Sequence, residues 1–337
     1  MKNMISGFWK KIKKPFFVLA PMADVTDYAF RQIIAKYGKP DVFWTEFVSA
    51  DGLAHPDARK KLLIDLKYGK NEHPIVAQIF GSKTENIKKA AQLCADLGFD
   101  GIDINMGCPD KSIEKQLSGA ASIKNPQHAI EIIKAAKEGA PELPISVKTR
   151  IGYNKNEIET WIPELLKQEI SVLTVHLRTR KEMSKVPAHW DLMPRIIELR
   201  NQISPKTLII GNGDALNLKD AKNKIKESGC DGVMFGRAIF GNPFLFTEKN
   251  VLSKVEEQSL HNTLDKTIAE KLKIMVLHTK LFEKELGKYK NFAIMKKHFK
   301  AYVNGFEGAK ELRMELMEAE NADQVKKNIN DFLKKIC

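Results

Sequence analysis

The residues with the clearest chemical potential lie between positions 101 and 109, where the chain reads Gly-Ile-Asp-Ile-Asn-Met-Gly-Cys-Pro. A short apolar run that contains Asp103 and Asn105 and then opens into Gly-Cys-Pro predicts a buried strand with a thiol-bearing loop at its carboxyl end. Glycine lets the backbone turn and proline fixes the next φ, so the Cys108 thiol would be held in place. Cys108 is therefore a candidate reactive group. A lone cysteine can also be a small buried hydrophobe, and this stretch alone leaves both interpretations open.

Seven further strand-like runs accompany this one, each short, apolar and rich in β-branched or aromatic residues. Together the eight predicted strands cover residues 16–22, 42–48, 75–80, 101–106, 145–149, 172–176, 208–211 and 232–236. Most are followed by a segment with helical spacing, and strands that alternate with helices form parallel sheets. Eight such units predict an α/β fold of the (β/α)8 TIM-barrel type. An open doubly wound sheet is the alternative, but no Gly-x-Gly-x-x-Gly follows the first strand.

In such a barrel the carboxyl ends of all strands face one mouth, where side chains from distant parts of the chain meet. Polar groups, glycines or turn residues stand at these ends in nearly every predicted strand. In chain order they are Pro21, Met22, Gln78, Asn105, Cys108, Lys148, Arg150, His176, Arg178, Arg180, Asn212, Gly213, Asp214, Gly236 and Arg237. Each has an ordinary explanation when taken alone, such as a satisfied core histidine at His176 or a helix cap at Lys148. Their convergence on one mouth favours a functional site.

The ends of the last two strands suggest what this site holds. Gly211, Gly213 and Gly236 would let backbone amides approach a phosphate closely. The helices that follow present their N-termini, and Arg237 adds a charge-assisted donor. Because the loops after strands seven and eight are the usual phosphate site of a TIM barrel, we expect a phosphorylated cofactor or substrate there. Lys148 would then place a positive charge beside the other end of that ligand.

The charge and cysteine content limit the class of protein. The 337 residues carry a formal net charge of +13, which favours association with a polyanion, nucleic acid before an anionic membrane surface. No apolar run approaches the roughly 20 residues of a membrane-spanning helix, and the basic start runs into Pro15 without a signal-peptide pattern. The four cysteines show no CxxC spacing, which argues against a zinc site or a disulfide framework. These features predict a cytoplasmic protein without a metal.

The end of the chain has a different organisation. Apolar residues at helical spacing predict helices over residues 264–285, 292–303 and 322–336, and hence a small helical bundle. The predicted domains are a barrel over residues 1–245 and a helical domain over residues 246–337.

Lysines and aromatic residues interleave in the middle of this helical region, between positions 284 and 302. Lys296, Lys297 and His298 belong to this pattern, which suits contacts with a nucleic-acid backbone and its bases. A lysine-rich solvated helix face over an aromatic core stripe would give the same pattern, so composition alone does not decide between the two.

Taken together, these motifs resemble those of the tRNA-dihydrouridine synthases, an FMN-dependent family with a catalytic barrel and a carboxyl-terminal helical domain. The resemblance covers nearly the whole chain. The matching segments are Ala-Pro-Met-Ala-Asp-Val-Thr-Asp at 20–27, Asn-Met-Gly-Cys-Pro at 105–109, Lys115 through Gly119-Ala120-Ala121, Val-Lys-Thr-Arg-Ile-Gly at 147–152, His-Leu-Arg-Thr-Arg at 176–180, Gly-Asn-Gly-Asp at 211–214 and Gly-Arg-Ala-Ile-Phe-Gly-Asn-Pro at 236–243. Lys297 and His298, with Tyr302 and Gly305, are similar to the family's carboxyl-terminal signature.

The resemblance implies an oxidoreductase that reduces uridines of tRNA to 5,6-dihydrouridine. NADPH or NADH would reduce FMN, and the reduced flavin would deliver hydride to C6 of the uracil while Cys108 protonates C5. A thiol suits this role, because its ordinary pKa of about 8.5 keeps it mostly protonated at neutral pH. The uridine must leave its base stack to reach a flavin in a barrel mouth, which is easiest in a loop such as the tRNA D-loop.

The same resemblance implies roles for the site residues. Lys148 would stabilise negative charge on the reduced flavin, Gln78 would bond the edge of its ring system, and Asn105 would orient the base. The set implied for the cofactor is Pro21, Met22, Gln78, Lys148, His176, Asn212, Gly213, Asp214, Gly236 and Arg237. The set implied for the tRNA is Asn105, Arg178, Arg180, Lys296, Lys297 and His298. We expect a monomer that binds tRNA and no membrane.

Three other functions stay open from the residues themselves. A barrel flavoenzyme that reduces a free pyrimidine would share the phosphate loops and a catalytic cysteine, although the basic helical extension disfavours it. A non-catalytic RNA-binding protein would need only the basic surface, which leaves Cys108 and Lys148 unexplained. A phosphosugar aldolase or isomerase would leave the Cys108 loop unexplained. Flavin absorbance in the purified protein would exclude the last two.

Overall fold

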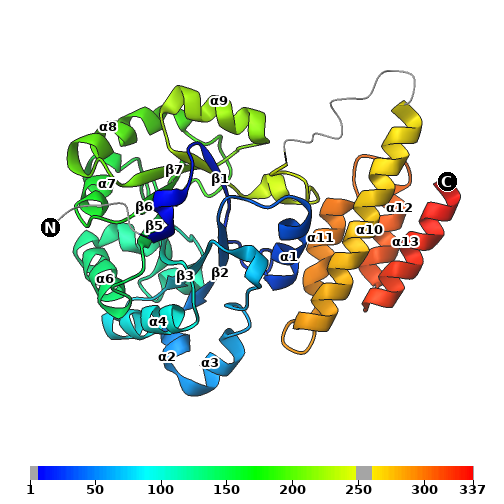
Figure 1. The fold of residues 1–337 in the computed structure, drawn as a ribbon, viewed down its shortest axis with the longest axis horizontal. Helices are drawn as coiled ribbons and strands as arrows, with labels where there is room; N and C mark the ends of the chain where they lie inside the picture. Colours follow the sequence, from blue (N-terminus) through cyan, green and yellow to red (C-terminus); the bar gives the residue numbers. More distant parts are fainter. Residues whose placement is uncertain (1–6, 248–259, 337) are drawn as a thin grey trace. The chain divides into compact units, whose positions relative to one another are not determined.

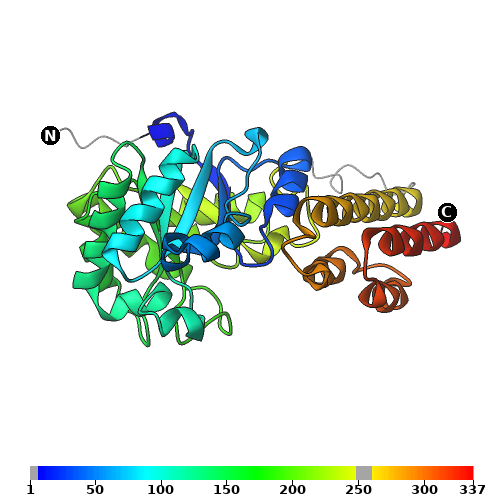
Figure 2. The same cartoon turned by 90° about the horizontal axis from the view of Figure 1, so that it is seen from below.

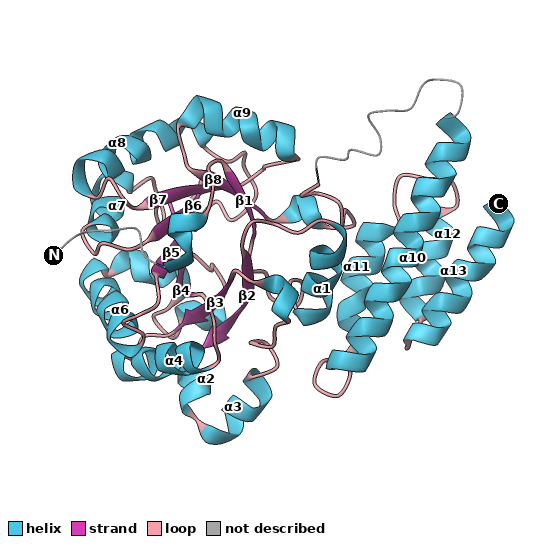
Figure 3. Cartoon of the chain, viewed as in Figure 1, coloured by secondary structure: helices cyan, strands magenta, loops and turns pink. Residues whose placement is uncertain are grey.

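Eight parallel strands curl around a common core and alternate with helices (Figure 3). They are β1 (Phe16–Leu19), β2 (Phe43–Ser49), β3 (Ile75–Phe80), β4 (Gly101–Met106), β5 (Ile145–Arg150), β6 (Val172–His176), β7 (Leu208–Asn212) and β8 (Gly232–Phe235). Their order in the sheet is β1-β8-β7-β6-β5-β4-β3-β2, and an isolated parallel bridge joins Val18 of β1 to Val42, the residue before β2. The predicted TIM-barrel fold is confirmed. The first strand ends earlier than predicted, because Pro21 cannot donate to a sheet ladder.

The computed structural model describes residues 7–247 and 260–336. The chain forms two compact units, one of residues 1–22 and 41–236 and the other of residues 23–40 and 237–337. We call the first the barrel unit and the second the helical unit. The predicted division of roles between a catalytic domain and a tRNA-binding domain stays a prediction.

The helices of the barrel unit lie around the outside of its strands (Figure 1). They are α2 (Ala50–Ala54), α3 (Pro56–Leu62), α4 (Thr84–Asp96), α5 (Lys111–Glu114), α6 (Pro126–Gly139), α7 (Ile158–Leu166), α8 (Met193–Ile203) and α9 (Leu218–Ser228). Helical spacing of apolar residues gives them a buried stripe, which in α4 consists of Ile87, Ala90, Ala91 and Cys94. The barrel therefore rests on buried apolar faces of its helices, which leaves the strand ends available for polar groups.

The interior of the barrel changes from apolar to polar along the strands. A buried cluster that includes Trp9, Val76 and Leu208 fills the part near the amino ends of the strands. Gln78 lies two residues beyond Val76 on the same face of β3, and Asn212 lies four residues beyond Leu208 on the same face of β7. The carboxyl half of the interior is thus lined by side chains that can form hydrogen bonds, as a binding site requires.

The helical unit combines α1 (Tyr28–Tyr37) with helices from the end of the chain. These are α10 (Leu260–Leu286), α11 (Met295–Tyr302), α12 (Ala309–Glu318) and α13 (Ala322–Ile336). Helix α10 packs against α1 and α13, and α10 and α13 lie side by side in both views (Figures 1 and 2). The three predicted helical segments are found. Helix α12 was not predicted from the sequence. Its N-cap residue is Gly308, which has no side chain to cap the helix, so the usual signal for a helix start is missing.

No helix within residues 7–247 and 260–336 is long and apolar enough to cross a membrane. In the same part of the chain, no group of three or more His, Cys, Asp or Glu side chains is arranged to hold a metal ion.

Candidate active site

Cys108 lies in the loop that follows β4, and its side chain is only partly exposed. Its backbone N–H donates to Asn105 Oδ1 at 2.9 Å, and the Gly107 N–H donates to the same oxygen at 3.1 Å. Burial raises the pKa of the Cys108 thiol, while the backbone N–H of Asp110 and the charges of Lys148 and Arg150 act in the opposite direction. The thiol therefore keeps its proton at neutral pH, as a proton donor must.

Gly119 and Ala120 support the backbone of Cys108. The Ala120 N–H donates to the Cys108 carbonyl at 2.8 Å, which folds residues 119–124 back onto the thiol loop. Gly119 has a φ of +62°, and a Cβ there would stand 2.7 Å from the Cys108 oxygen and 2.9 Å from Ile113 Cγ2. Only glycine fits this position, because it tolerates both the left-handed backbone and the close approach. The Gly-Ala-Ala segment noted in the sequence is thus part of the support of Cys108.

A chain of hydrogen bonds connects Asn105 to the interior of the barrel. Asn105 Nδ2 donates to Gln78 Oε1 at 2.9 Å, and Gln78 Nε2 donates to Asp103 Oδ2 at 2.6 Å. The Ser146 hydroxyl donates to the other carboxylate oxygen of Asp103 at 2.5 Å. The strand registers pair Gln78 with Asp103 and Asp103 with Ser146, so the three side chains form one polar layer across β3, β4 and β5. All members of this chain are buried.

Lys148 stands beside Asn105 in the register of β4 and β5, one step nearer the mouth than the Asp103 layer. The pKa of the Lys148 ammonium is lowered to about 8, mainly by burial and to a smaller extent by the positive charge of Arg150. Asp103 and Cys108 act in the opposite direction. A cation in this position is costly unless an anion lies near it. Lys148 is therefore suited to meet negative charge on a ligand.

His176, Arg178 and Asp214 form a second polar group, at the ends of β6 and β7, in which Arg178 is buried and the other two are half-buried. Arg178 donates to His176 Nε2 at 3.1 Å, to the Val186 carbonyl at 2.6 Å and to the Asp214 carboxylate. Because a guanidinium cannot accept a hydrogen bond, His176 Nε2 must be the acceptor, and its neutral ring carries the proton on Nδ1. This differs from the expectation that Arg178 faces the RNA, since its side chain is only 3% exposed and is held inside the barrel unit.

Arg180 and Arg150 tie the loops around Cys108 together. Arg180 forms a two-pronged ion pair with Glu114, which lies six residues after Cys108 at the end of α5. Arg150 donates to the Gly107 carbonyl at 2.8 Å and to the Thr179 carbonyl at 3.0 Å. The loops that follow β4, β5 and β6 are thus joined by charge-assisted hydrogen bonds. A contact of Arg180 with tRNA stays a prediction.

The predicted phosphate residues fall into two groups. At Gly236 an added Cβ would lie in ordinary van der Waals contact, 3.8 Å from the Met22 sulfur and 4.0 Å from the Ala20 Cβ, so side chains do not cover this backbone tightly. Arg237 follows directly and is exposed. Gly211 differs from the expectation, because a Cβ there would stand 2.4 Å from the Trp190 ring, so this glycine serves packing and not phosphate approach.

Asn212, Gly213 and Asp214 are engaged within the barrel unit. Asn212 Nδ2 donates to the Met234 carbonyl at 2.9 Å, which ties β7 to β8. The Gly213 carbonyl accepts from the Trp190 ring N–H at 2.7 Å, and the Asp214 carboxylate accepts from the Ala188 N–H at 2.9 Å. Their backbone stands at the predicted place, and their roles toward a cofactor stay predictions.

Lys296, Lys297 and His298 lie on α11 of the helical unit. Lys297 is exposed and its ammonium lies 3.6 Å from the Asp24 carboxylate, while Lys296 is half-buried. His298 differs from the expectation of an RNA-facing side chain. It is fully buried, with its ring 4.6 Å from that of His278 and 5.1 Å from that of Phe30. Helical spacing places it on the apolar face of α11, where burial lowers its pKa to about 3.

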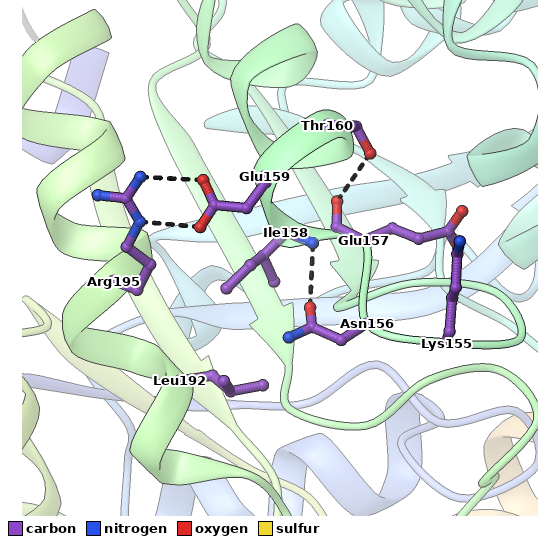
Figure 4. A pocket seen from close by; sticks show the side chains of 8 residues that line it. All are labelled: Lys155, Asn156, Glu157, Ile158, Glu159, Thr160, Leu192 and Arg195. Atoms are coloured by element: carbon purple, nitrogen blue, oxygen red, sulfur yellow. Dashed lines mark hydrogen bonds and ion pairs between the residues drawn. The ribbon is translucent and has the colours of Figure 1, made fainter.

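A pocket of about 430 Å³ lies elsewhere on the barrel unit, between the start of α7 and α8 (Figure 4). Arg195 donates two hydrogen bonds to the Glu159 carboxylate, at 2.8 and 2.9 Å, and Asn156 Oδ1 accepts from the Ile158 N–H at 3.1 Å. These groups pair with one another, and none of the predicted site residues lines the pocket. The chemistry of the molecule is therefore better assigned to the barrel mouth.

Four residues that shape this mouth were not assigned a role from the sequence: Asp103, Ser146, Arg150 and Gly119. Asp103 carried a signal, since a carboxylate inside an apolar strand run, two residues before Asn105, shares the face of that residue. Ser146 carried none, because a serine in a strand has many ordinary explanations.

Comparison with known proteins agrees with this geometry. The dihydrouridine synthase family model matches residues 18–337. A probable tRNA-dihydrouridine synthase 2 of Bacillus subtilis (strain 168) is 42% identical over 334 residues, with 98% of each chain covered. A probable tRNA-dihydrouridine synthase of Staphylococcus aureus (strain Mu50) is 40% identical over 331 residues, 98% of this chain and 96% of its own length.

Among solved structures, a 2-naphthoyl-CoA reductase in complex with 2-naphthoyl-CoA superposes with a TM-score of 0.51 at 13% identity. The match covers 68% of this chain and 49% of the reductase chain, and it shows a shared barrel fold. Because the family match extends over nearly the whole chain and includes the Cys108 loop, this protein belongs to the dihydrouridine synthase family.

Proposed function

We propose that this protein reduces uridines of tRNA to 5,6-dihydrouridine, with FMN as its cofactor and NADPH as the electron donor. The observation that carries the proposal is the state of Cys108, a thiol that burial keeps protonated and that backbone hydrogen bonds hold at the barrel mouth. Family membership and the names of the two bacterial relatives support the same reaction on the same class of substrate. The reaction would take place in the cytoplasm, on a uridine of the tRNA D-loop.

The residues at the mouth fit a flavin nucleotide. A group beside the Gly236 backbone would make only ordinary contacts, the nearest with the Met22 sulfur at 3.8 Å, so a phosphate could approach this backbone, and Arg237 would supply a charge for it. Lys148, which is half-buried at the mouth, would supply a cation for the anionic part of a reduced ring system. When bound there, FMN would supply the hydride for C6 of the uracil.

Cys108 would donate the proton to C5 of the uracil. The thiol is protonated before the reaction because burial raises its pKa, and it must carry a negative charge once the proton has left. The charges of Lys148 and Arg150 favour that thiolate, so the same surroundings allow both states. Asn105 keeps the sulfur in place through the Cys108 N–H and presents its second amide N–H to the base.

The lysines of α11 would bind the tRNA backbone. Lys297 and Lys300 are exposed on the helix face opposite His298 and Phe299, which are buried. Arg180 would contribute from the barrel unit, where it is held by Glu114. A monomer that presents both sets of charges would neutralise several phosphates of one tRNA.

The test is dihydrouridine formation in an unmodified tRNA transcript, with FMN and NADPH supplied and the product measured by mass spectrometry. Cys108→Ala should lower the rate by about 10²–10⁴-fold, the usual contribution of a positioned general acid. Reduction of bound FMN by NADPH, followed by the decrease in flavin absorbance, should be unchanged. Cys94→Ala, which removes a buried thiol of α4, is the matched control and should keep the parent rate. Dihydrouridine at the parent rate in Cys108→Ala would exclude Cys108 as the acid.

A further inference from the structure

The hydrogen bonds between Asp103 and the Cys108 loop form one continuous chain with a fixed direction. At one end the Gly107 and Cys108 backbone N–H groups can only donate, and both bond to Asn105 Oδ1. At the other end an ionised Asp103 can only accept, and it takes a hydrogen bond from Gln78 Nε2. Two side-chain amides, those of Gln78 and Asn105, stand between these ends.

Only one orientation of the two amides satisfies every junction of this chain. If Gln78 turned over, its carbonyl oxygen would face the Asp103 carboxylate, and its NH2 group would face the NH2 group of Asn105. If Asn105 turned over as well, its NH2 group would face the two backbone N–H groups of the loop. Each mismatch leaves a buried polar atom without a partner, which typically shifts the unfolding equilibrium by roughly 5- to 150-fold.

Burial makes this dependence on orientation strict. Gln78 and Asp103 are 0% exposed and Asn105 is 7% exposed, so bulk water has little access to a mismatched group. The strand registers hold the chain in place, since Gln78 pairs with Asp103 across β3 and β4. Ser146 bonds to the Asp103 oxygen that faces away from Gln78, and it therefore lies outside the path to Cys108.

We propose that Asp103 is a positioning residue for Cys108. Asp103 acts through Gln78 and Asn105, because it fixes the orientation of both side-chain amides. The carboxylate does not touch the reacting atoms. Together with the two backbone N–H groups of the loop, it sets which atom of Asn105 faces the loop, and thereby where the thiol stands and which amide hydrogens are left for a ligand. This inference rests on the proposed role of Cys108 in catalysis.

The first experiment measures hydrogen exchange at the Gly107 and Cys108 amides by mass spectrometry of peptides across residues 105–112, in protein freed of flavin. Asp103→Leu removes the acceptor, and protection of these amides should fall about tenfold or more. Asp103→Asn keeps an acceptor oxygen for Gln78 and should stay within about threefold of the parent. Ser146→Ala removes a partner of the same carboxylate outside the path and is the matched control, with parent-like protection expected. Equal protection in Asp103→Leu and the parent would overturn the proposal.

The second experiment remains informative if Asp103→Leu does not fold. In Asn105→Asp, Gln78 stands between two carboxylates, and its amide oxygen must face one of them without a hydrogen bond. The equilibrium constant for unfolding should therefore rise about tenfold or more. Adding Asp103→Asn lets the whole chain reverse its direction. The new amide at position 103 would donate to Gln78, and Gln78 would donate to the new carboxylate at position 105. The double variant should therefore be more stable than Asn105→Asp alone.

Relief of simple repulsion between two carboxylates could also make the double variant more stable than Asn105→Asp. The same substitutions in a Gln78→Met protein separate this cause from the reversal of the hydrogen-bond chain. Gln78→Met removes the transmitting amide but leaves both carboxylate positions in place. Asp103→Asn should then no longer rescue Asn105→Asp. A rescue that persists in Gln78→Met, or a double variant no more stable than Asn105→Asp, would overturn the proposal. These measurements need neither flavin nor tRNA, so their outcome is independent of whether the protein makes dihydrouridine.

Discussion

Gly119 and Cys108 are packed so closely that a Cβ on Gly119 would stand 2.7 Å from the Cys108 carbonyl oxygen. The two residues are eleven positions apart, and the Ala120 N–H joins them by its hydrogen bond to the same oxygen. The position of the thiol therefore depends on a glycine that carries no reactive group.

Gly119→Ala should lower the free energy of unfolding by more than the roughly 1–2 kcal/mol that a left-handed alanine costs by itself. The additional cost arises because the new Cβ must push away the Cys108 carbonyl and Ile113. Urea unfolding and the rate of iodoacetamide alkylation of Cys108, read by peptide mass spectrometry, measure the two effects. Gly229→Ala is the matched control, since Gly229 also has a positive φ but its nearest atom, Ile197 Cγ2, is 3.9 Å away. Equal decreases in stability in the two variants, with unchanged alkylation of Cys108, would contradict the proposed packing.

Lys148 should make stability depend on pH in the alkaline range. Its pKa is lowered from 10.5 to about 8 in the folded chain, so between these values the unfolded chain binds more protons. The free energy of unfolding should therefore rise as pH increases from about 8 toward 10.5, by up to about 3 kcal/mol in flavin-free protein. Urea unfolding of the parent and of Lys148→Met at pH 7.5, 8.5 and 9.5 isolates this contribution. A difference between the two proteins that does not change with pH would show that Lys148 has its ordinary pKa.

Arg237→Ala should weaken FMN binding, because the phosphate would no longer have this charged hydrogen-bond donor. Such a hydrogen bond contributes about 1.5–3 kcal/mol, so the dissociation constant should rise roughly 10- to 150-fold. Quenching of flavin fluorescence during titration of flavin-free protein gives this constant. Arg195→Ala removes an arginine that pairs with Glu159 on the barrel unit, and it should bind FMN as the parent does. Undiminished affinity in Arg237→Ala would remove this residue from the phosphate site.

The lysines of α11 should carry a measurable part of the salt dependence of tRNA binding. Lys296→Glu/Lys297→Glu/Lys300→Glu should flatten the slope of log K against log salt by roughly 0.7–0.9 for each phosphate that is no longer neutralised. NADPH oxidation in the absence of tRNA should be unchanged. Lys326→Glu/Lys327→Glu/Lys335→Glu reverses three exposed charges on α13 and should alter the slope much less. If both triple variants behave alike, α11 contributes only to the net charge.

The sequence by itself was sufficient for the architecture and for the convergence of the candidate residues at one end of the barrel. Short apolar runs alternating with helical segments predict parallel strands, and parallel strands bring their carboxyl ends together whatever the details of packing. Turn residues act locally, so Gly107 and Pro109 were enough to place Cys108 in a loop after β4. For the same reason Gln78, Asn105 and Lys148 could be assigned to one mouth before their partners were known.

Only the tertiary structure decided what each polar side chain bonds to. Arg178 and Asp214 are 36 positions apart and Gln78 and Asp103 are 25 apart, and such pairs depend on strand register and loop path rather than on local pattern. The same holds for His298, whose burial against Phe30 requires α1 and α11 to meet within the helical unit. Local spacing determines which face of a strand or helix a side chain occupies. The partner on that face comes from a distant part of the chain. This partner decides whether an arginine is exposed to RNA or forms an ion pair with a carboxylate.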